Sequence, residues 1–227
     1  AIKGAVEAKG LRERVEALVA AWKVYGKESV VLPSLALVFL YLTVLQPGVL
    51  LTAYLKAVGV SDAALGGFRA VAAVAGVGST FVTPVAMKHL GILKAGLMWL
   101  YQDLFCLGVG LVFFILSGQS GTQWAVYPFL IALILSRFGL YGFDLSEVQI
   151  LQDNIPAGRR GAFSGVEATL IQTFSIVCFA IAIVVPSVDS FIYLVFGSIG
   201  AVTAAVLIYT VWYLRLAPTP PPQTSEV

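Results

Sequence analysis

The sequence predicts an all-α membrane protein, a six-transmembrane-helix bundle preceded by an amphipathic helix. Hydrophobic residues make up 59% of the chain and charged residues 11%, whereas charged residues are about 25% of a soluble domain. The mean hydropathy is +0.93. Six apolar stretches reach the roughly 20 residues that a helix needs to cross a hydrocarbon core of about 30 Å. These observations indicate a lipid environment and exclude an ordinary soluble domain.

The chain begins with an amphipathic stretch and ends with a proline-rich one. Residues 1–29 are predicted to form an interfacial helix and linker, because apolar residues recur at helical spacing among charged ones. Residues 30–216 are predicted to form the six-helix transmembrane domain. Residues 217–227, with their run of prolines, are predicted to form a disordered tail. Because the chain starts at Ala1 without Met, we interpret it as a fragment of a longer protein.

The six crossings are expected at residues 30–58, 64–86, 92–117, 124–152, 161–185 and 191–214. Helix-breaking or charged residues separate them. The predicted breaks are Gly59 with Asp62, the stretch 87–89, the stretch 118–121, Pro156 with Gly158, and Pro186 with Asp189.

Basic residues are distributed unevenly between the two membrane faces. An even number of crossings places both termini on the same face. Of the 14 Lys and Arg residues, all except Lys56, Arg69 and Arg137 fall on that face. The positive-inside rule therefore predicts that both termini are cytoplasmic or stromal. The net charge of +2 gives no indication of a nucleic-acid partner.

Ionisable residues inside the crossings are costly in lipid unless they face protein, water or a ligand. Helical spacing places Arg137, Asp144 and Glu147 on one face of the fourth crossing, and Glu167 and Cys178 on one face of the fifth. One interpretation is the polar lining of a transport cavity, which an isolated bundle would leave exposed. The other is a set of interhelical pairs that fix packing.

The first crossing contains Gln46, Pro47 and Gly48 near its middle. Pro47 has no backbone donor and Gly48 tolerates unusual dihedral angles, so the helix is expected to break here. Broken helices at the membrane midplane expose carbonyl and amide groups that carriers use to bind substrates. A simple proline kink without a ligand is the alternative.

Three segments together resemble the ferroportins, the iron exporters of solute carrier family 40. They are FLYLTVL at 39–45, SRFGLYGFDLSEVQILQDN at 136–154 and RRGAFSGVEA at 159–168. The resemblance implies the C-terminal six-helix half of a major-facilitator-like carrier that works by alternating access. It also implies an N-terminal six-helix half as partner, the lipid membrane as surroundings, and a divalent metal as transported substrate without a permanently bound cofactor.

The resemblance further implies a metal site in this half. Val49 stands where animal ferroportins have a cysteine, and Cys178 stands where they have a histidine. Cys178 is therefore the candidate metal ligand, because a thiolate suits soft or borderline metals. Gln46, the carbonyls freed by Pro47, and Ser175 are candidate oxygen donors. Val49 argues against control by hepcidin, which the family cysteine anchors in vertebrates.

The arginine of an Arg-Gly pair at the cytoplasmic mouth of ferroportins corresponds to Arg160, which is expected to act as a gate by bridging carboxylates of the two halves. The complete set of predicted cavity and gate residues is Gln46, Pro47, Gly48, Arg137, Asp144, Glu147, Arg160, Glu167 and Ser175, with Cys178 as the metal ligand.

The resemblance implies transport of iron, with cobalt or nickel as further candidates, across the plasma membrane or a plastid or vacuolar membrane. A non-transporting membrane fragment or scaffold, or a carrier of a non-metal substrate, is the alternative. No catalytic Ser/His/Asp set, Walker loop or HExxH motif occurs in the sequence, so an enzyme is not expected.

Overall fold

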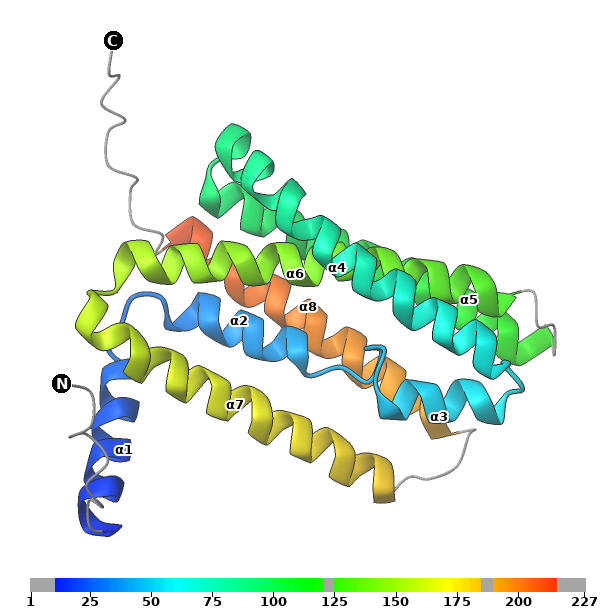
Figure 1. Ribbon diagram of the computed structural model, residues 1–227, viewed down its shortest axis with the longest axis horizontal. Helices are drawn as coiled ribbons and strands as arrows, with labels where there is room; N and C mark the ends of the chain where they lie inside the picture. Colours follow the sequence, from blue (N-terminus) through cyan, green and yellow to red (C-terminus); the bar gives the residue numbers. More distant parts are fainter. Residues whose placement is uncertain (1–10, 121–124, 185–189, 216–227) are drawn as a thin grey trace.

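The structure is a computed structural model that describes residues 11–120, 125–184 and 190–215. These residues form eight α-helices (Figure 1). Their bounds are α1 Leu11–Tyr25, α2 Val31–Tyr41, α3 Val49–Ala57, α4 Asp62–Leu90, α5 Ile92–Ser120, α6 Val126–Asn154, α7 Ala157–Val184 and α8 Phe191–Arg215. The predicted tail at 217–227 and the predicted break at Pro186 lie outside the described residues.

Helices α4 to α8 are each long and apolar enough to cross a membrane. The predicted first crossing consists of two shorter helices, α2 and α3, joined by a non-helical stretch. The described part of the chain therefore confirms the predicted all-α membrane fold, with five continuous crossings and one broken crossing.

Two of the five predicted breaks are present and the one at 87–89 is wrong, while α5 continues to Ser120 within the break predicted at 118–121, whose last residue is not described. Gly59 and Gly91 have φ values of 90° and 81° and form the turns on either side of α4, a conformation that glycine adopts without strain. The break predicted at 87–89 is absent, since α4 continues to Leu90. Lys88 and His89 instead occupy the last turn, where basic side chains interact favourably with the helix dipole. Pro156 separates α6 from α7 as predicted.

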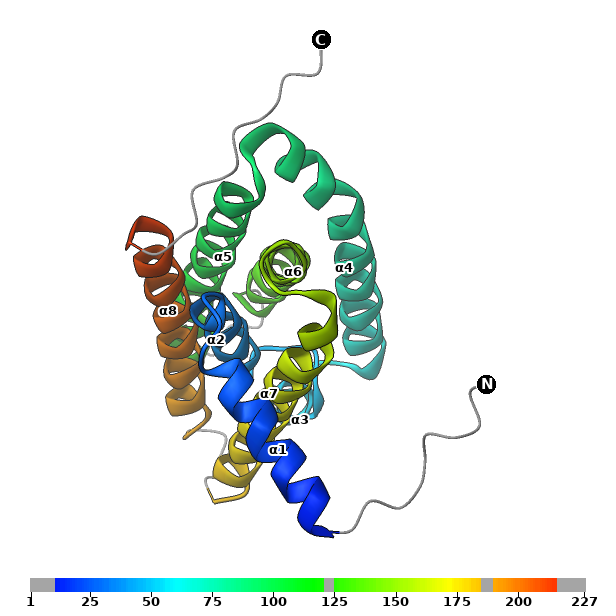
Figure 2. The ribbon, with the colours of Figure 1, turned by 90° about the vertical axis from the view of Figure 1, so that its left-hand side faces the viewer.

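Helix α6 lies at the centre of the bundle, between α4 and α5 (Figure 2). In its most apolar stretch 56% of the residues are buried, against 11% in that of α7. Helix α2 packs against α8 and α7. The largest fully buried side chains include Trp212, Tyr209, Phe143 and Phe163. Helices α4 and α7 leave large apolar side chains uncovered, among them Phe81 and Ile183.

Helix α1 lies across one end of the bundle and packs against α7 (Figure 1). Its last residue, Tyr25, is buried against Phe163, with ring centroids 4.6 Å apart. Leu18, Val19 and Trp22 remain exposed. An exposed apolar face on a helix at the end of a membrane bundle suits the interfacial position expected from the sequence.

Apart from Lys56, Arg69 and Arg137, the described basic residues lie at helix ends on one side of the bundle. The end of α1, the α4–α5 turn, the α6–α7 turn and the end of α8 all lie on the left in Figure 1. Lys56 lies near the opposite end, where its Nζ is 2.9 Å from Oδ1 of Asp62. The positive-inside rule predicts that the left-hand end faces the cytoplasm or stroma.

A cysteine-labelling scan checks this orientation. A cysteine introduced at residues 121–123 is expected to react with a membrane-impermeant maleimide added from outside, whereas Gly158→Cys is expected to react only after permeabilisation. Gly158 has open space around it, so the substitution is tolerated. The unsubstituted chain gives the background of the native thiols. The reverse pattern would overturn the orientation.

Candidate functional site

The break in the first crossing is wider than the sequence predicts. Helix α2 ends at Tyr41 and α3 begins at Val49, so residues 42–48 are not helical. Pro47 cannot donate a backbone hydrogen bond, and the residue before a proline is disfavoured in the helical region. The backbone N–H of Val44 donates instead to Oγ of Ser198 on α8, at 2.9 Å. The predicted break is thus confirmed, and a hydrogen bond to another helix helps to hold its non-helical conformation.

The N-terminus of α3 opens into this break. Its N-cap is Gly48, in extended conformation, and no side chain caps the helix. An uncapped helix N-terminus presents unpaired N–H groups and the positive end of the helix dipole. The break therefore places backbone donors close to the predicted substrate site.

A cavity of about 150 Å³, here called the thiol pocket, lies beside the break. It is lined by Tyr41, Thr43, Val44, Gln46, Gly48, Val49, Leu50, Ser175, Cys178 and Phe179. The structure therefore brings four predicted site residues into one pocket: Gln46 and Gly48 from the break, and Ser175 and Cys178 from α7. Within the described residues no group of three or more His, Cys, Asp or Glu side chains is arranged to hold a metal ion.

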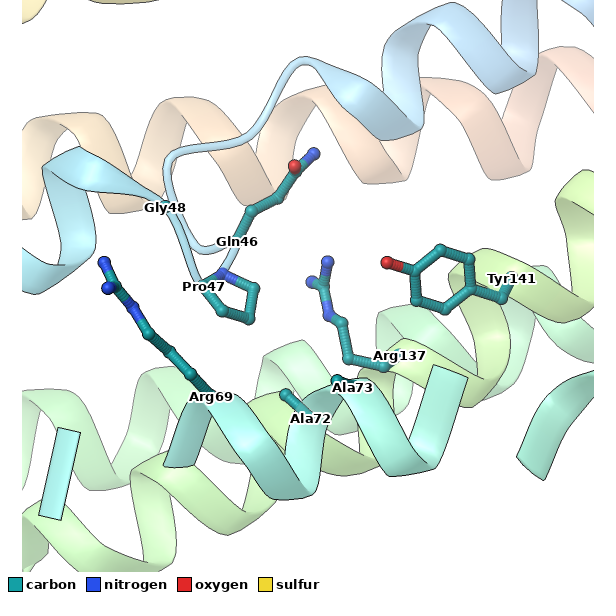
Figure 3. A pocket seen from close by; sticks show the side chains of 8 residues that line it. All are labelled: Gln46, Pro47, Gly48, Arg69, Ala72, Ala73, Arg137 and Tyr141. Atoms are coloured by element: carbon teal, nitrogen blue, oxygen red, sulfur yellow. The ribbon is translucent and has the colours of Figure 1, made fainter. Parts of the chain in front are cut away.

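A larger cavity of about 410 Å³, here called the arginine pocket, shares Gln46 and Gly48 with the thiol pocket (Figure 3). It is lined by Gln46, Pro47, Gly48, Arg69, Ala72, Ala73, Arg137 and Tyr141. Arg137 therefore lines the same cavity as the residues of the break, which agrees with the interpretation of the polar residues as the lining of a transport cavity. Arg69 was not among the predicted site residues, although a charged residue within a crossing is itself a signal.

Two of the three predicted carboxylates accept hydrogen bonds from α2, whereas both carboxylate oxygens of Glu147 are buried without a hydrogen-bond partner among the described residues. Tyr41 donates from its hydroxyl to Oδ2 of Asp144, at 3.2 Å. Ser34 donates to Oε2 of Glu167, and the hydroxyl oxygens of Tyr25 and Ser34 are 2.9 Å apart. Because the single proton of Ser34 goes to Glu167, the Tyr25 hydroxyl is the donor in that second bond. Burial raises the pKa of Tyr25 to about 12, so this donor keeps its proton at neutral pH.

The expectation that an isolated half leaves its carboxylates uncovered is wrong for two of them. Glu147 is 1% exposed and Glu167 is 9% exposed within this chain alone. The physical reason is the position of α2, which packs against both α6 and α7 and covers the space between them. Asp144 is only partly covered.

Arg160 bonds to the end of α6 in this structure. Its Nε donates to the carbonyl oxygen of Ile155 at 2.7 Å, and its Nη2 donates to that of Gln152. Its neighbour Arg159 forms an ion pair with Glu28, at 2.7 Å. These contacts tie the α6–α7 turn together at the basic end of the bundle. The gate function of Arg160 stays a prediction.

A helical membrane bundle whose first crossing is broken beside two polar pockets has the architecture of one half of a membrane carrier. Comparison with known proteins then identifies the family to which this membrane protein belongs. The chain belongs to the ferroportin family, since residues 4–202 match the family described as Ferroportin1 (FPN1). It is therefore a multi-pass integral membrane protein.

Individual relatives agree with this assignment. The chain is 33% identical over 196 residues to "Solute carrier family 40 member 1" of Oryza sativa subsp. japonica, covering 86% of this chain and 40% of the relative. It is 34% identical over 183 residues to "Ferreportin" of Bdellovibrio bacteriovorus, covering 80% and 41%. The chain thus spans less than half the length of these relatives.

Solved structures have the same fold. A bacterial homologue of the iron transporter ferroportin in its outward-facing state matches with a TM-score of 0.78 and 32% identity, covering 84% of this chain and 47% of that one. The inward-facing state also matches with a TM-score of 0.78, at 33% identity, covering 82% and 46%. The chain therefore resembles both states equally well.

Proposed function

We propose that this chain is the C-terminal half of a secondary transporter that moves a divalent metal across a membrane by alternating access. The observation that carries the proposal is the thiol pocket, where Cys178, Ser175 and Gln46 meet at the broken helix. The proposed substrate is iron, with cobalt or nickel as further candidates, because a thiolate suits borderline metals. A related bacterial structure described as outward-facing with soaked iron supports this choice.

The half is proposed to move as a rigid body. Its equal similarity to the outward-facing and inward-facing relatives supports motion between halves over rearrangement within this one. Alternating access in carriers with repeated halves works largely through such rocking.

An N-terminal six-helix half is the proposed partner. Together with lipid it would cover the apolar side chains that α4 and α7 leave exposed, such as Phe81 and Ile183. The metal is proposed to pass through as substrate and not as a resident cofactor. We propose neither an enzymatic activity nor control by hepcidin, since the relatives are described as transporters and Val49 offers no thiol.

A non-transporting scaffold is the second candidate. The interhelical bonds of Ser34 to Glu167 and of Tyr41 to Asp144 are what a purely structural role of these polar residues predicts. They leave the thiol pocket unexplained, because Cys178 and Ser175 lie beside the break without joining those bonds. A change in metal affinity on replacing Cys178, with folding intact, therefore separates the two candidates.

Residues 1–227 alone are expected to give no metal flux in liposomes. Both pockets lie in one half, and alternating access needs a second half to close each side of the substrate site in turn. Uptake of iron, cobalt or nickel is measured with the chain alone and with the full-length carrier in the same liposomes. Robust uptake by the chain alone would contradict the proposal.

A further inference from the structure

The arginine pocket contains cationic and donor groups but no carboxylate. Its polar side chains come from three elements: Gln46 from the break, Arg69 from α4, and Arg137 and Tyr141 from α6. None of its eight lining residues is Asp or Glu. This composition is unfavourable for a bare divalent cation and favourable for an anion.

Arg137 is a buried cation that does not use all of its hydrogen-bond donors within the described residues. It is 3% exposed, and its Nη2 contacts only Oγ of Ser136, at 3.2 Å, among the hydrogen bonds of the described residues. Its Nε has no partner there. Asp103 on α5 faces Arg137 at electrostatic range, but no ion pair joins the two in the described structure, and Asp103 does not line the pocket. A guanidinium has five N–H groups, and Arg137 lines the pocket, so donors that Ser136 does not accept from can bind a ligand there.

Arg69 supplies a second cation at a different part of the wall. One of its nitrogens donates to Oγ1 of Thr52, at 2.7 Å, which leaves the rest of the guanidinium free to bind. In Figure 3 the guanidinium groups of Arg69 and Arg137 lie on either side of Pro47. Between them, Gly48 begins the uncapped α3 helix, whose N-terminus also favours negative charge.

We propose that the arginine pocket binds a small dicarboxylate or tricarboxylate. Two separated guanidinium groups suit a ligand with at least two carboxylates, and arginine binds each carboxylate with directional, charge-assisted hydrogen bonds. A cavity of about 410 Å³ is large enough for such a molecule. The site is additional to the proposed metal transport, and binding to it requires no metal.

An anion bound in the arginine pocket would affect metal binding in the thiol pocket, because the two pockets are neighbours. Gln46 and Gly48 line both the arginine pocket and the thiol pocket. An unoccupied arginine pocket repels a divalent cation that arrives beside Cys178, and a bound polycarboxylate offsets this repulsion.

Calorimetric titration of the full-length carrier in metal-free buffer tests the proposal, with succinate and citrate as probes and acetate as the monocarboxylate control. We expect saturable binding of succinate or citrate, weaker binding of acetate, and loss of affinity as salt is raised. Arg69→Gln is expected to lower the affinity about tenfold or more. Arg69 is exposed in this chain, so the substitution is expected to leave its folding intact.

Two further variants sharpen the test. Arg215→Gln removes the same charge at the exposed end of α8 and is expected to bind like the wild type. Ala73→Glu places a carboxylate one helical turn from Arg69, where the two side chains pair, and is expected to abolish binding. No saturable binding, equal losses in Arg69→Gln and Arg215→Gln, or equally tight binding of acetate would overturn the proposal. The absence of saturable binding is the result expected if a carboxylate side chain of the N-terminal half fills the pocket instead. Because no metal is present, none of these results depends on whether the carrier moves metal.

Discussion

Gly139→Ala is expected to destabilise the bundle by roughly 3 kcal/mol, the upper part of the usual range for overpacking. A Cβ atom at Gly139 would lie 2.5 Å from Cβ of Asp103 and 2.7 Å from the backbone oxygen of Trp99. Neither neighbour is the free end of a flexible side chain, so α5 and α6 would have to separate. Close approach of helices at small residues is a principal source of stability in membranes, where the hydrophobic effect does not drive association between helices.

Gly108→Ala is the matched control. Gly108 lies on α5, and nothing is within 4 Å of the Cβ that the substitution adds. Alanine is the better helix former by up to about 1 kcal/mol, so this variant is expected to be as stable as the wild type or slightly more stable. Unfolding of both variants in detergent, followed by far-ultraviolet circular dichroism, measures the difference. Equal stability of the two variants would contradict the close α5–α6 contact.

Cys178→Ser in the full-length carrier is expected to lower the affinity for cobalt or iron by at least about tenfold. Loss of even an outer-shell partner of a metal ligand costs that much, and a serine hydroxyl is a poor replacement for a thiolate with borderline metals. The two side chains have similar volumes, and Cys178 is only partly buried. Folding and expression are therefore expected to change little, and calorimetric titration measures the affinity.

Cys106 provides the control for that experiment. It is the other free cysteine, it is buried on α5, and its sulfur accepts a hydrogen bond from Nε2 of Gln102 at 3.1 Å. Because it lines neither pocket, Cys106→Ser is expected to leave metal affinity unchanged.

A gain of function completes the test of the thiol pocket. Val49 and Cys178 both line this pocket. Val49→Cys combined with Cys178→His is expected to raise the affinity, because two convergent ligands replace one. Identical affinities of the wild type, Cys178→Ser and the double variant would remove Cys178 from the site.

The sequence by itself determined the membrane class, five continuous crossings and the break at Pro47, and it predicts the orientation. These features depend on local chemistry, namely the length of an apolar run, the side on which basic residues fall, and the missing N–H of a proline. The sequence was less reliable for helix ends. It predicted a break at 87–89, where α4 continues, and a break of three residues where seven are not helical.

Helical spacing also determined which site residues share a face. It placed Arg137, Asp144 and Glu147 on one side of α6. In the structure Arg137 lines the pocket at the break, Asp144 accepts a hydrogen bond from α2, and Glu147 is buried. Spacing along one helix fixes such a face because the geometry repeats every 3.6 residues.

Only the tertiary structure decided which faces meet. Ser34 and Glu167 are 133 residues apart in sequence, and Tyr41 and Asp144 are 103 apart. Arg69 and Arg137 share a pocket although they lie on different helices. Such pairings depend on how each helix is rotated and how closely it approaches its neighbours. That is set by side-chain packing over whole helix faces, and no local pattern in the sequence encodes it.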